Sequence, residues 1–480
     1  MAKLKNIIKQ LSDEDFEAIH ASLIESNADK SAYLLKSMRE KHLSDAKIMS
    51  ELDVNTNAYY TLRSRLNQKI EEYLLQQMES PRTDILKKVA NINEIIFTKK
   101  WAIAVATLKK LEKELLDYDL SNELTIVYKS LKKLHINSPE LFTYSQLYNK
   151  HVAYTLALDK AEDLLADYFK KYGHYMMSGE ESDKLELTLV SREMNNVCSL
   201  YKSHRLYVYQ SCLNIFHRLF VEKEEDMEGE VEPIEDILNN IQKIFNLYHL
   251  DSIYYHLQIV FDFLKLEYYN HYKVYRKAEN YFEEVNESIS SLMTNYSLFT
   301  FPAQFLITKI QRHIRMDNVE DMYEENEALF HDFECDKNDV PKFITYVTYR
   351  ALSCYYARKY DEAAKWLNNL LNEVSFKRYP HAQLEIKAIL ALQYCLLSDF
   401  DLFNQLVNSI QRQVRLLGKD NCDHILNLTK ILKVSISDTK KNKQLKIHTF
   451  LSKFEKVEKN YFAPTMLLKL DDDFAKRLSQ

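Results

Sequence analysis

The sequence contains few side-chain combinations that could catalyse a reaction or hold a metal ion. None of its 15 histidines and 6 cysteines forms a HExxH or CxxC motif. Glu17 and His20 form one Glu-x-x-His motif, whereas a di-iron helical bundle needs two such motifs and two further glutamates. Cys422 and His424 are close in sequence but have no further ligand residues beside them. Because no nucleophile with a recognisable base is present either, we expect no enzyme activity and no cofactor.

A second chemistry that the sequence could support is contact with DNA, through the stretch SDAKIMSELDVNTNAYYTLRSRL between Ser44 and Leu66. We expect two short helices here, the first capped by Ser44 and the second by Asn55. Both residue types accept hydrogen bonds from the free backbone N–H groups of a first helical turn. The apolar side chains that would face inward are Ile48, Leu52, Val54, Tyr59, Leu62 and Leu66.

This stretch resembles the helix-turn-helix of sigma-factor region 4 and of related response-regulator domains. The two differences are Asp53, where the family usually has glycine, and Met49, where it usually has alanine. Aspartate tolerates left-handed backbone better than most residues do. The resemblance implies that the start of the second helix enters the major groove of DNA. The residues that would then meet bases or phosphates are Lys47, Asn55, Thr56, Asn57, Tyr60, Arg63 and Arg65.

The charge of this N-terminal part argues against strong DNA binding. Residues 1–75 contain 11 basic and 12 acidic side chains, and the whole chain has a formal net charge of −6. Proteins that bind DNA usually present a basic face, because neutralising phosphates supplies much of the affinity. The sequence leaves two alternatives open, an N-terminal part that binds DNA and one that docks on a protein.

The glycine content indicates the fold class. The 480 residues include only 4 glycines and 7 prolines, whereas average usage is roughly 7 % glycine and 5 % proline. Strand hairpins and βα turns need glycine at positive φ, so the sequence predicts an all-α protein. The motifs GxxxxGK[ST], GxGxxG and GxSxG are all missing, which argues against nucleotide-binding P-loop and Rossmann enzymes and against α/β-hydrolases.

The sequence also favours a cytoplasmic protein. No uncharged apolar run reaches transmembrane length, and the N-terminus lacks the apolar core and cleavage site of a signal peptide. The six scattered cysteines are expected to be reduced thiols. We therefore expect no association with membranes.

Three regions are expected along the chain. Residues 1–78, called the head below, would form a helix-turn-helix-like helical domain that ends before Pro81. Residues 84–418 would contain long amphipathic helices rich in tyrosine and phenylalanine, and residues 419–480 would form capping helices. One loop is expected at KKYGHYMMSGEESDKLE, residues 170–186, because it contains two of the four glycines.

The middle region contains a degenerate repeat, whose clearest unit is ALSCYYARKYDEAAKWLNNLLNE. This unit resembles a tetratricopeptide (TPR) repeat, in which small residues such as Ala351 and Ala363 lie where two helices touch. The resemblance implies a TPR-like α-solenoid, with a step longer than the 34 residues of the family. The equivalent positions in successive units are Ala161, Ile237, Ala278, Met322, Ala363 and Phe403. From Ile237 onward these positions are 40 to 44 residues apart.

A stack of helix pairs leaves a concave surface, which usually binds an extended peptide or a partner helix. The aromatic run SIYYHLQIVFDFLKLEYYNHYKVY, residues 252–275, is either part of such a surface or ordinary core packing. Two functions remain open. One is a regulator whose repeats bind a protein or peptide and whose head binds DNA or the transcription machinery. The other is a pure protein-interaction scaffold that binds no nucleic acid.

Overall fold

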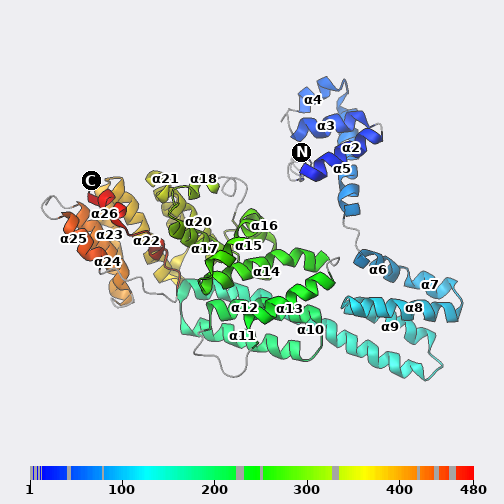
Figure 1. Ribbon diagram of the computed structural model, residues 1–480. Coiled ribbons are helices and arrows are strands. Elements are labelled where there is room, and N and C mark those ends of the chain that lie inside the picture. The colour runs from blue at the N-terminus through cyan, green and yellow to red at the C-terminus, as the bar shows by residue number, and fades with distance from the viewer. Residues whose placement is uncertain are drawn as a thin grey trace. The chain divides into compact units, whose positions relative to one another are not determined.

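The computed structural model describes Leu4, Ile8, Leu11 and residues 13–26, 28–39, 45–77, 81–222, 232–248, 252–326, 335–418, 422–436, 443–452 and 461–479. For some residues in these ranges it describes only the backbone. Within these ranges the chain forms 24 α-helices and two short 3₁₀ helices, with no β-strand (Figure 1). The predicted all-α class is therefore confirmed.

The chain divides into two compact units, Met1–Tyr118 and Asp119–Gln480. The predicted domain boundaries at residues 78, 84 and 418 stay predictions. The helices of the first unit are α2 (Asp13–Glu25), α3 (Asp29–Arg39), α4 (Asp45–Glu51), α5 (Thr56–Gln77), α6 (Pro81–Ala90), α7 (Ile92–Thr98) and α8 (Trp101–Asp117).

The second unit holds the other helices. They are α9 (Ser121–Leu134), α10 (Glu140–Ser178), α11 (Glu181–Ser199), α12 (His204–Phe220), α13 (Ile234–Leu247), α14 (Ser252–His271), α15 (Tyr275–Glu287), α16 (Ile289–Asn295), α17 (Ala303–Met316), α18 (Met322–Glu325), α20 (Val340–Tyr356), α21 (Tyr360–Glu373), α22 (Pro380–Leu396), α23 (Phe400–Leu417), α24 (Asp423–Ile436), α25 (Lys443–Leu451) and α26 (Asp472–Ser479), with 3₁₀ helices η2 (Phe376–Arg378) and η4 (Pro464–Leu467).

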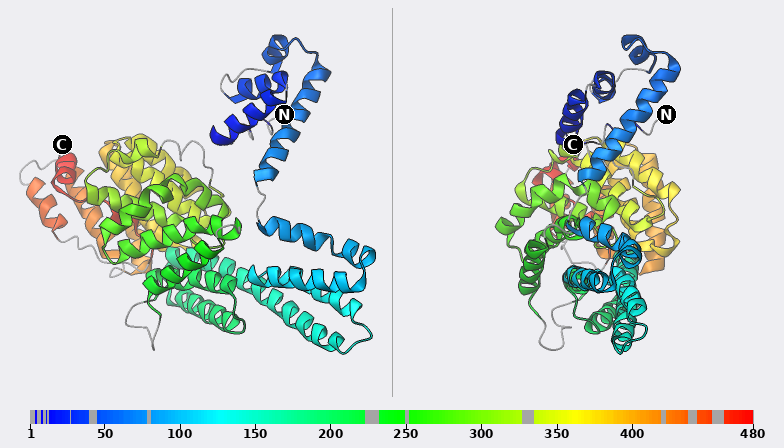
Figure 2. Two further views of the ribbon diagram at one scale, coloured as in Figure 1. Left: turned by 45° about the vertical axis from the view of Figure 1, so that its right-hand side comes forward. Right: turned by 90° about the vertical axis from the view of Figure 1, so that its right-hand side faces the viewer.

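Several helices that follow one another in the second unit pack side by side. The pairs α14–α15, α20–α21 and α22–α23 form close hairpins, and α21 also packs against α22. Figure 2 shows α20 to α23, coloured yellow to orange, lying side by side. A single amphipathic helix buries only one face, so each hairpin needs the next one to cover its remaining apolar side.

Four turns between helices share one backbone conformation, and none of them uses glycine. Lys273, Asp317, Arg358 and Ser398 all have φ between 59° and 61°, the left-handed region. In each turn the N–H of the following residue bonds to a carbonyl five residues earlier; the distance is 2.8 Å between Lys359 and the Cys354 carbonyl. These bonds offset the roughly 1–2 kcal/mol that a side chain costs in this conformation. A chain with four glycines can therefore still make tight helical turns.

Four of the six predicted repeat positions have equivalent places relative to these turns, whereas no left-handed residue lies five positions before Ala161 or Ile237 in the described part of the chain. Ala278, Met322, Ala363 and Phe403 each lie five residues after one of the left-handed residues, and each is at most 1 % exposed. Ala351, the predicted small partner of Ala363, is also fully buried, on α20. Small or flexible apolar side chains at these points let the second helix approach the first.

The predicted loop at residues 170–186 is wrong for most of its length. α10 continues through Gly173 to Ser178 and the chain turns only at Gly179, whose φ is 67°. Gly173 lies in a close contact instead: a Cβ there would be 3.1 Å from the Pro341 Cβ and 3.2 Å from the Phe301 ring. This glycine thus permits close packing of α10 rather than a turn.

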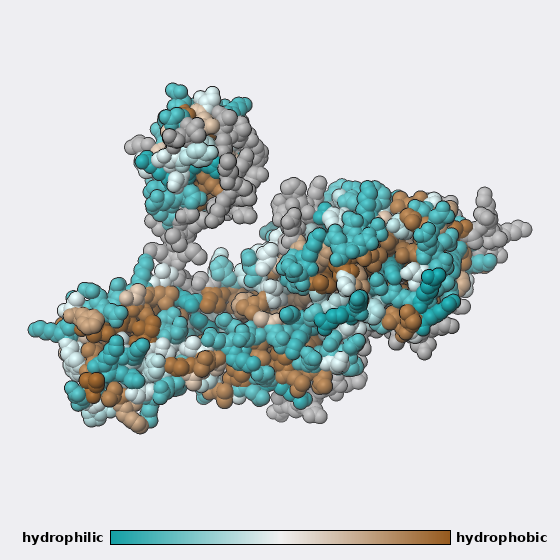
Figure 3. Space-filling view, turned by 180° about the vertical axis from the view of Figure 1, so that it is seen from behind, coloured by the Kyte–Doolittle hydropathy of each residue, from teal (hydrophilic) through white to brown (hydrophobic). Residues whose placement is uncertain are grey.

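Buried apolar side chains among the described residues form two clusters. One lies in the first unit, with members from Leu4 to Ile70, and the other extends through the second unit from Tyr154 to Leu478. Figure 3 shows that on one face of the molecule apolar and hydrophilic residues are interspersed on the surface. Scattered exposed apolar side chains of this kind are ordinary on helical proteins.

Candidate functional sites

The predicted DNA-contacting stretch forms α4 and the first turns of α5, joined by a tight corner. Asp53 has a φ of 49°, the left-handed conformation for which sigma-factor region 4 uses glycine. The Val54 N–H bonds to the Met49 carbonyl at 3.1 Å, which closes the end of α4. The Asn55 side-chain oxygen accepts the Ala58 N–H at 2.9 Å, so Asn55 caps α5 as predicted.

The apolar stripe of this stretch faces the head's core. Ile48, Tyr59 and Leu66 are at most 1 % exposed, and they pack in one cluster with Leu34 and Leu35 of α3. The remaining predicted inward residues are partly buried against the same cluster: Leu52, Val54 and Leu62. Ser44, the other predicted cap, lies outside the described residues.

The seven predicted DNA-contacting residues have different environments. Arg63 is only 9 % exposed, and its guanidinium lies 5.8 Å from the centre of the Tyr59 ring. Thr56 and Asn57 belong to α5, but their side chains lie outside the part of the chain that the structure describes. The other four side chains are exposed on α4 and the start of α5: Lys47, Asn55, Tyr60 and Arg65. Their contact with DNA stays a prediction.

The exposed surface of α4 and α5 carries charges of both signs. Glu51 and Asp53 are exposed beside the basic residues of this face. The Tyr33 hydroxyl of α3 donates a hydrogen bond to Glu51. On α5, Lys69 pairs with Glu72 at 3.5 Å. Glu51 lies one helical turn from Lys47 on α4, and acidic side chains on this surface weaken its attraction for phosphates.

A second candidate site is a row of two separate pockets beside α14 in the second unit, which we call the α14 groove. Its floor is α14 and its walls are α13 and α15, which both pack against α14. Four floor residues line the pockets from one helix face, with the buried Asp262 on the same face between them: Tyr255, Gln258, Lys265 and Tyr269. This face belongs to the aromatic run at residues 252–275, so the run contributes both to a surface and to the core.

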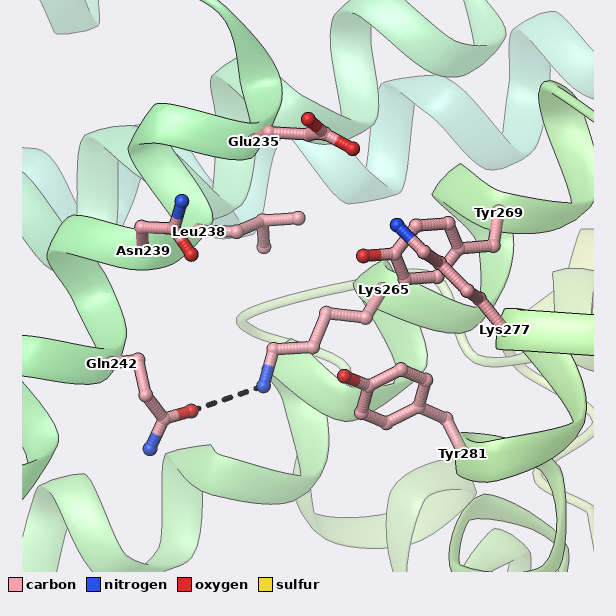
Figure 4. A pocket seen from close by; sticks show the side chains of 8 residues that line it. All are labelled: Glu235, Leu238, Asn239, Gln242, Lys265, Tyr269, Lys277 and Tyr281. Carbon is pink, nitrogen blue, oxygen red and sulfur yellow. Dashed lines mark hydrogen bonds between the residues drawn. The ribbon is translucent and has the colours of Figure 1, made fainter. Parts of the chain in front are cut away.

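One end of the α14 groove is a polar pocket with a volume of about 310 Å³. Figure 4 shows Glu235, Leu238, Asn239 and Gln242 of α13 on one side, and two lysines and two tyrosines on the other. The Lys277 ammonium lies 5.1 Å from the centre of the Tyr269 ring, and that of Lys265 lies 5.2 Å from the Tyr281 ring. Such contacts hold lysine side chains in place. Lys277 is exposed, whereas the Lys265 side chain is 12 % exposed and forms an ion pair with Asp262.

The other end of the α14 groove is an aromatic pocket of about 380 Å³. Tyr255 is 73 % exposed there, while Tyr254 beneath it is fully buried. Glu284 of α15, Ser288 between α15 and α16, and His256 of α14 supply polar groups at its edge. A tyrosine that exposes most of its ring offers apolar area to a ligand with little loss of conformational entropy.

A network of polar side chains connects the floor to the α13 wall. Asp262, only 4 % exposed, accepts hydrogen bonds from Gln258 and from Lys265, each at 3.0 Å. Lys265 also donates to the Gln242 side-chain oxygen at 3.1 Å, the bond drawn in Figure 4. Partial burial, with nearby Glu235, raises the pKa of the Tyr268 hydroxyl to about 12, so this phenol stays a neutral donor. The groove is therefore pre-organised, with its polar groups fixed before a ligand arrives.

Groups typical of metal sites and membrane spans were also sought. Among the described residues, no three His, Cys, Asp or Glu side chains gather in a way that could hold a metal ion. In the same part of the chain, no helix has both the length and the apolar character needed to cross a membrane. His424, half of the Cys-x-His motif, is buried and hydrogen-bonded to Glu385.

The sequence indicated the aromatic run but not the groove. Lys265 and Lys277 lie on different helices, and no periodicity links them to Gln242 of α13. The one available signal was the surplus of tyrosine on α14, which exceeds what a single buried stripe needs. Residues that meet only through the packing of three helices leave no local pattern in the sequence.

Comparison with known proteins does not identify a relative for this chain. No family model matches it, and neither a search of curated proteins nor one of solved structures gave a significant match.

Proposed function

We propose that this protein is a non-enzymatic, TPR-like binding protein with a helix-turn-helix head, acting as a regulator that couples partner binding to DNA or to the transcription machinery. In this proposal the second unit binds a segment of a protein or peptide. The head then carries the response to DNA or to a transcription protein.

The turn geometry supports the TPR-like part of the proposal. Left-handed residues recur at Lys273, Asp317, Arg358 and Ser398, at steps of 44, 41 and 40 residues. Each precedes a buried residue by the same five positions, as expected of a repeated helix pair. Repeats of this kind leave an extended surface on which a partner segment can lie.

The observation that carries the binding role is the α14 groove. It comprises a pocket lined by Lys265 and Lys277 and a separate pocket lined by the exposed ring of Tyr255, both beside α14. We propose an occupant with an acidic group for the lysine end and an apolar or aromatic side chain for the tyrosine end. Such a two-point fit suits an extended or helical segment of a protein better than a small metabolite.

Affinity capture with matched variants tests the binding role. The full-length protein is compared with Lys277→Glu and Tyr255→Ser in the groove, and with Lys129→Glu on the exposed surface of α9. The two groove variants should lose the captured partner at least tenfold, while the α9 variant should keep it. If all four proteins capture the same set equally, the α14 groove is not the binding site.

Two features support the DNA-binding part: the capped start of α5, and Lys47, Tyr60 and Arg65 exposed beside it. Selection of bound fragments from genomic DNA, followed by titration against salt, tests this part. Affinity should fall with salt concentration, because each neutralised phosphate releases counterions. Failure to enrich any sequence, or binding that does not respond to salt, would rule out this role for the head.

A second candidate function is a pure interaction scaffold, and the burial of Arg63 favours it. With Arg63 packed on Tyr59, one of the predicted phosphate contacts is withdrawn from the surface of the head. Exposed Glu51 and Asp53 reduce the positive charge further. Under this alternative, deleting residues 1–78 leaves partner capture by the second unit unchanged, and no DNA is selected by the full chain.

A further inference from the structure

A C-terminal segment without α-helix, residues 461–470, runs across three helices of the second unit, α17, α20 and α22. We call it the strap. Its residues contact α17 and α22, and hydrogen bonds tie it to α10 and α20. α17, α20 and α22 are each the first helix after a linker and before a left-handed turn, so they occupy equivalent places in the stack.

The helices hold the strap largely through its main chain. The Tyr356 hydroxyl of α20 donates to the Leu467 carbonyl at 2.6 Å and accepts the Lys469 N–H at 3.0 Å. At the other end, the Phe462 N–H donates to the Met176 carbonyl in the last turn of α10 at 2.6 Å. Bonds to the main chain are a common means by which a groove binds a peptide segment.

A fully buried carboxylate fixes the centre of the strap. Glu385 of α22 is 0 % exposed, and its Oε2 accepts the Thr465 N–H at 3.1 Å and the Thr465 hydroxyl at 2.5 Å. Its Oε1 lies 2.5 Å from Nε2 of His424, which orients the carboxylate. Glu385 therefore hydrogen-bonds to both the backbone and the side chain of Thr465.

Apolar side chains of the strap fill the surface between these hydrogen bonds. Phe462, Leu467 and Leu468 are 5 %, 7 % and 0 % exposed. Phe462 and Leu467 border a narrow apolar gap, with no room for a water molecule, against α17 and α20. The helix residues that line this gap are Leu306, Ile307, Ile310, Thr345, Thr348, Tyr349 and Leu352.

We propose that the face of α17, α20 and α22 that the strap covers is a peptide-binding surface, and that the strap is a built-in ligand which a partner segment displaces. The partner is a peptide that can form the same 3₁₀ turn as Pro464–Leu467 and has the strap's spacing: an aromatic residue, threonine or serine three positions later, and two consecutive leucine-like residues that begin two positions after that. This surface is separate from the α14 groove, so the inference does not rest on the function proposed for that groove.

The type of bonding makes exchange of the strap feasible. Its contacts to the array come from side chains and from single carbonyl or N–H groups, so its release breaks no helix. An incoming peptide of the same spacing would satisfy Tyr356, Glu385 and the Met176 carbonyl again. Removing a ligand of this kind is costly mainly because it leaves buried polar groups without partners. The incoming peptide avoids this cost, since it pairs with the same groups.

A labelled synthetic peptide of residues 461–470 tests the proposal on the full chain. It should bind at least tenfold more tightly to the strap variant Phe462→Ala/Thr465→Ala than to the unaltered protein, because the weakened strap competes less. Adding Glu385→Gln to that variant, or using a peptide with alanine in place of its threonine, should reduce binding at least tenfold. A folded strap variant that binds this peptide no better than a scrambled one would overturn the proposal.

Hydrogen exchange on the unaltered protein gives a second test, in case the strap variant does not fold. The amides of Phe462, Thr465 and Lys469 should exchange at least tenfold faster than core amides of α20, because the strap opens while the helices stay folded. If the exchange rates of the strap amides equal those of the core amides of α20, the strap is a permanent part of the core and the proposal is wrong.

Discussion

The carboxylate of Glu267 accepts a hydrogen bond from the Thr308 hydroxyl at 2.9 Å, and both side chains are buried between α14 and α17. Complete burial raises the pKa of Glu267 from 4.5 to about 8, although the bond from Thr308 partly opposes this shift. The carboxyl group is therefore mostly protonated in the folded protein at neutral pH and mostly ionised in the unfolded chain.

This difference predicts a pH-dependent stability. Between pH 4.5 and about 8 the folded state binds more protons than the unfolded state at Glu267, so the free energy of unfolding falls as the pH rises. Glu267→Gln removes the titration and keeps an oxygen that can accept from Thr308. Thermal unfolding at about pH 5 and about pH 8 should show a smaller loss of Tm in the variant.

Glu283→Gln on the exposed surface of α15 serves as the control for this experiment. Its loss of Tm between the two pH values should match that of the unaltered protein. An identical loss in Glu267→Gln would mean that Glu267 does not titrate in this range.

The left-handed turns give a prediction about glycine. Ser398 is exposed with a φ of 60°, so Ser398→Gly should raise the free energy of unfolding by about 0.5–1 kcal/mol, because relief of backbone strain exceeds the added entropy of the unfolded chain. Asn404→Gly, at an exposed position inside α23, should lower it by about 0.5–1 kcal/mol. Denaturant unfolding checks both, and a decrease for both variants would contradict the account of the turn.

Repeat packing gives a third prediction, at the contact between α20 and α21. Ala363 is fully buried, so Ala363→Leu should lower the free energy of unfolding by about 1–3 kcal/mol through overpacking. Ala166→Leu on the exposed side of α10 should change it by less than about 0.5 kcal/mol. Equal effects of the two substitutions in denaturant unfolding would show that Ala363 does not set the helix separation.

The two arginines of α5 should separate stability from DNA binding. Arg63→Ala should destabilise the protein by about 1 kcal/mol, because it removes a buried side chain from the Tyr59 ring. Arg65→Ala should leave thermal unfolding unchanged and, if the head binds DNA, weaken that binding and reduce its salt dependence. A large loss of stability in Arg65→Ala together with none in Arg63→Ala would reverse these assignments.

The sequence predicted features that depend on local backbone rules. Scarce glycine predicts helices throughout. Asp53 differs from the glycine of the family that this stretch resembles, but it tolerates the left-handed region, where it lies with a φ of 49°. Asn55 was expected to cap a helix, and it does so. These predictions succeed because a cap or a left-handed residue is fixed by neighbours within a few positions.

Features that depend on distant residues were not predictable. Glycine at position 173 predicts a loop, but Gly173 lies inside α10. Its role there depends on Pro341, far along the chain, which packs close to where a Cβ would otherwise be. The burial of Arg63 likewise depends on how α5 packs in the head. The strap has no helical or strand periodicity, and Glu385 gives no sign in the sequence that it will bind Thr465.

The long-range bonds of the strap also define an order of folding. The helix hairpins close over a few residues, whereas the strap's hydrogen bonds join positions 80 residues apart at Glu385 and 111 residues apart at Tyr356. Contacts between distant positions must overcome the entropy of closing a long loop, so they form after the local ones. The strap is thus expected to settle last, on an array that already exists. Until the strap binds in a newly made chain, the surface of α17, α20 and α22 is exposed and can bind a peptide of suitable sequence.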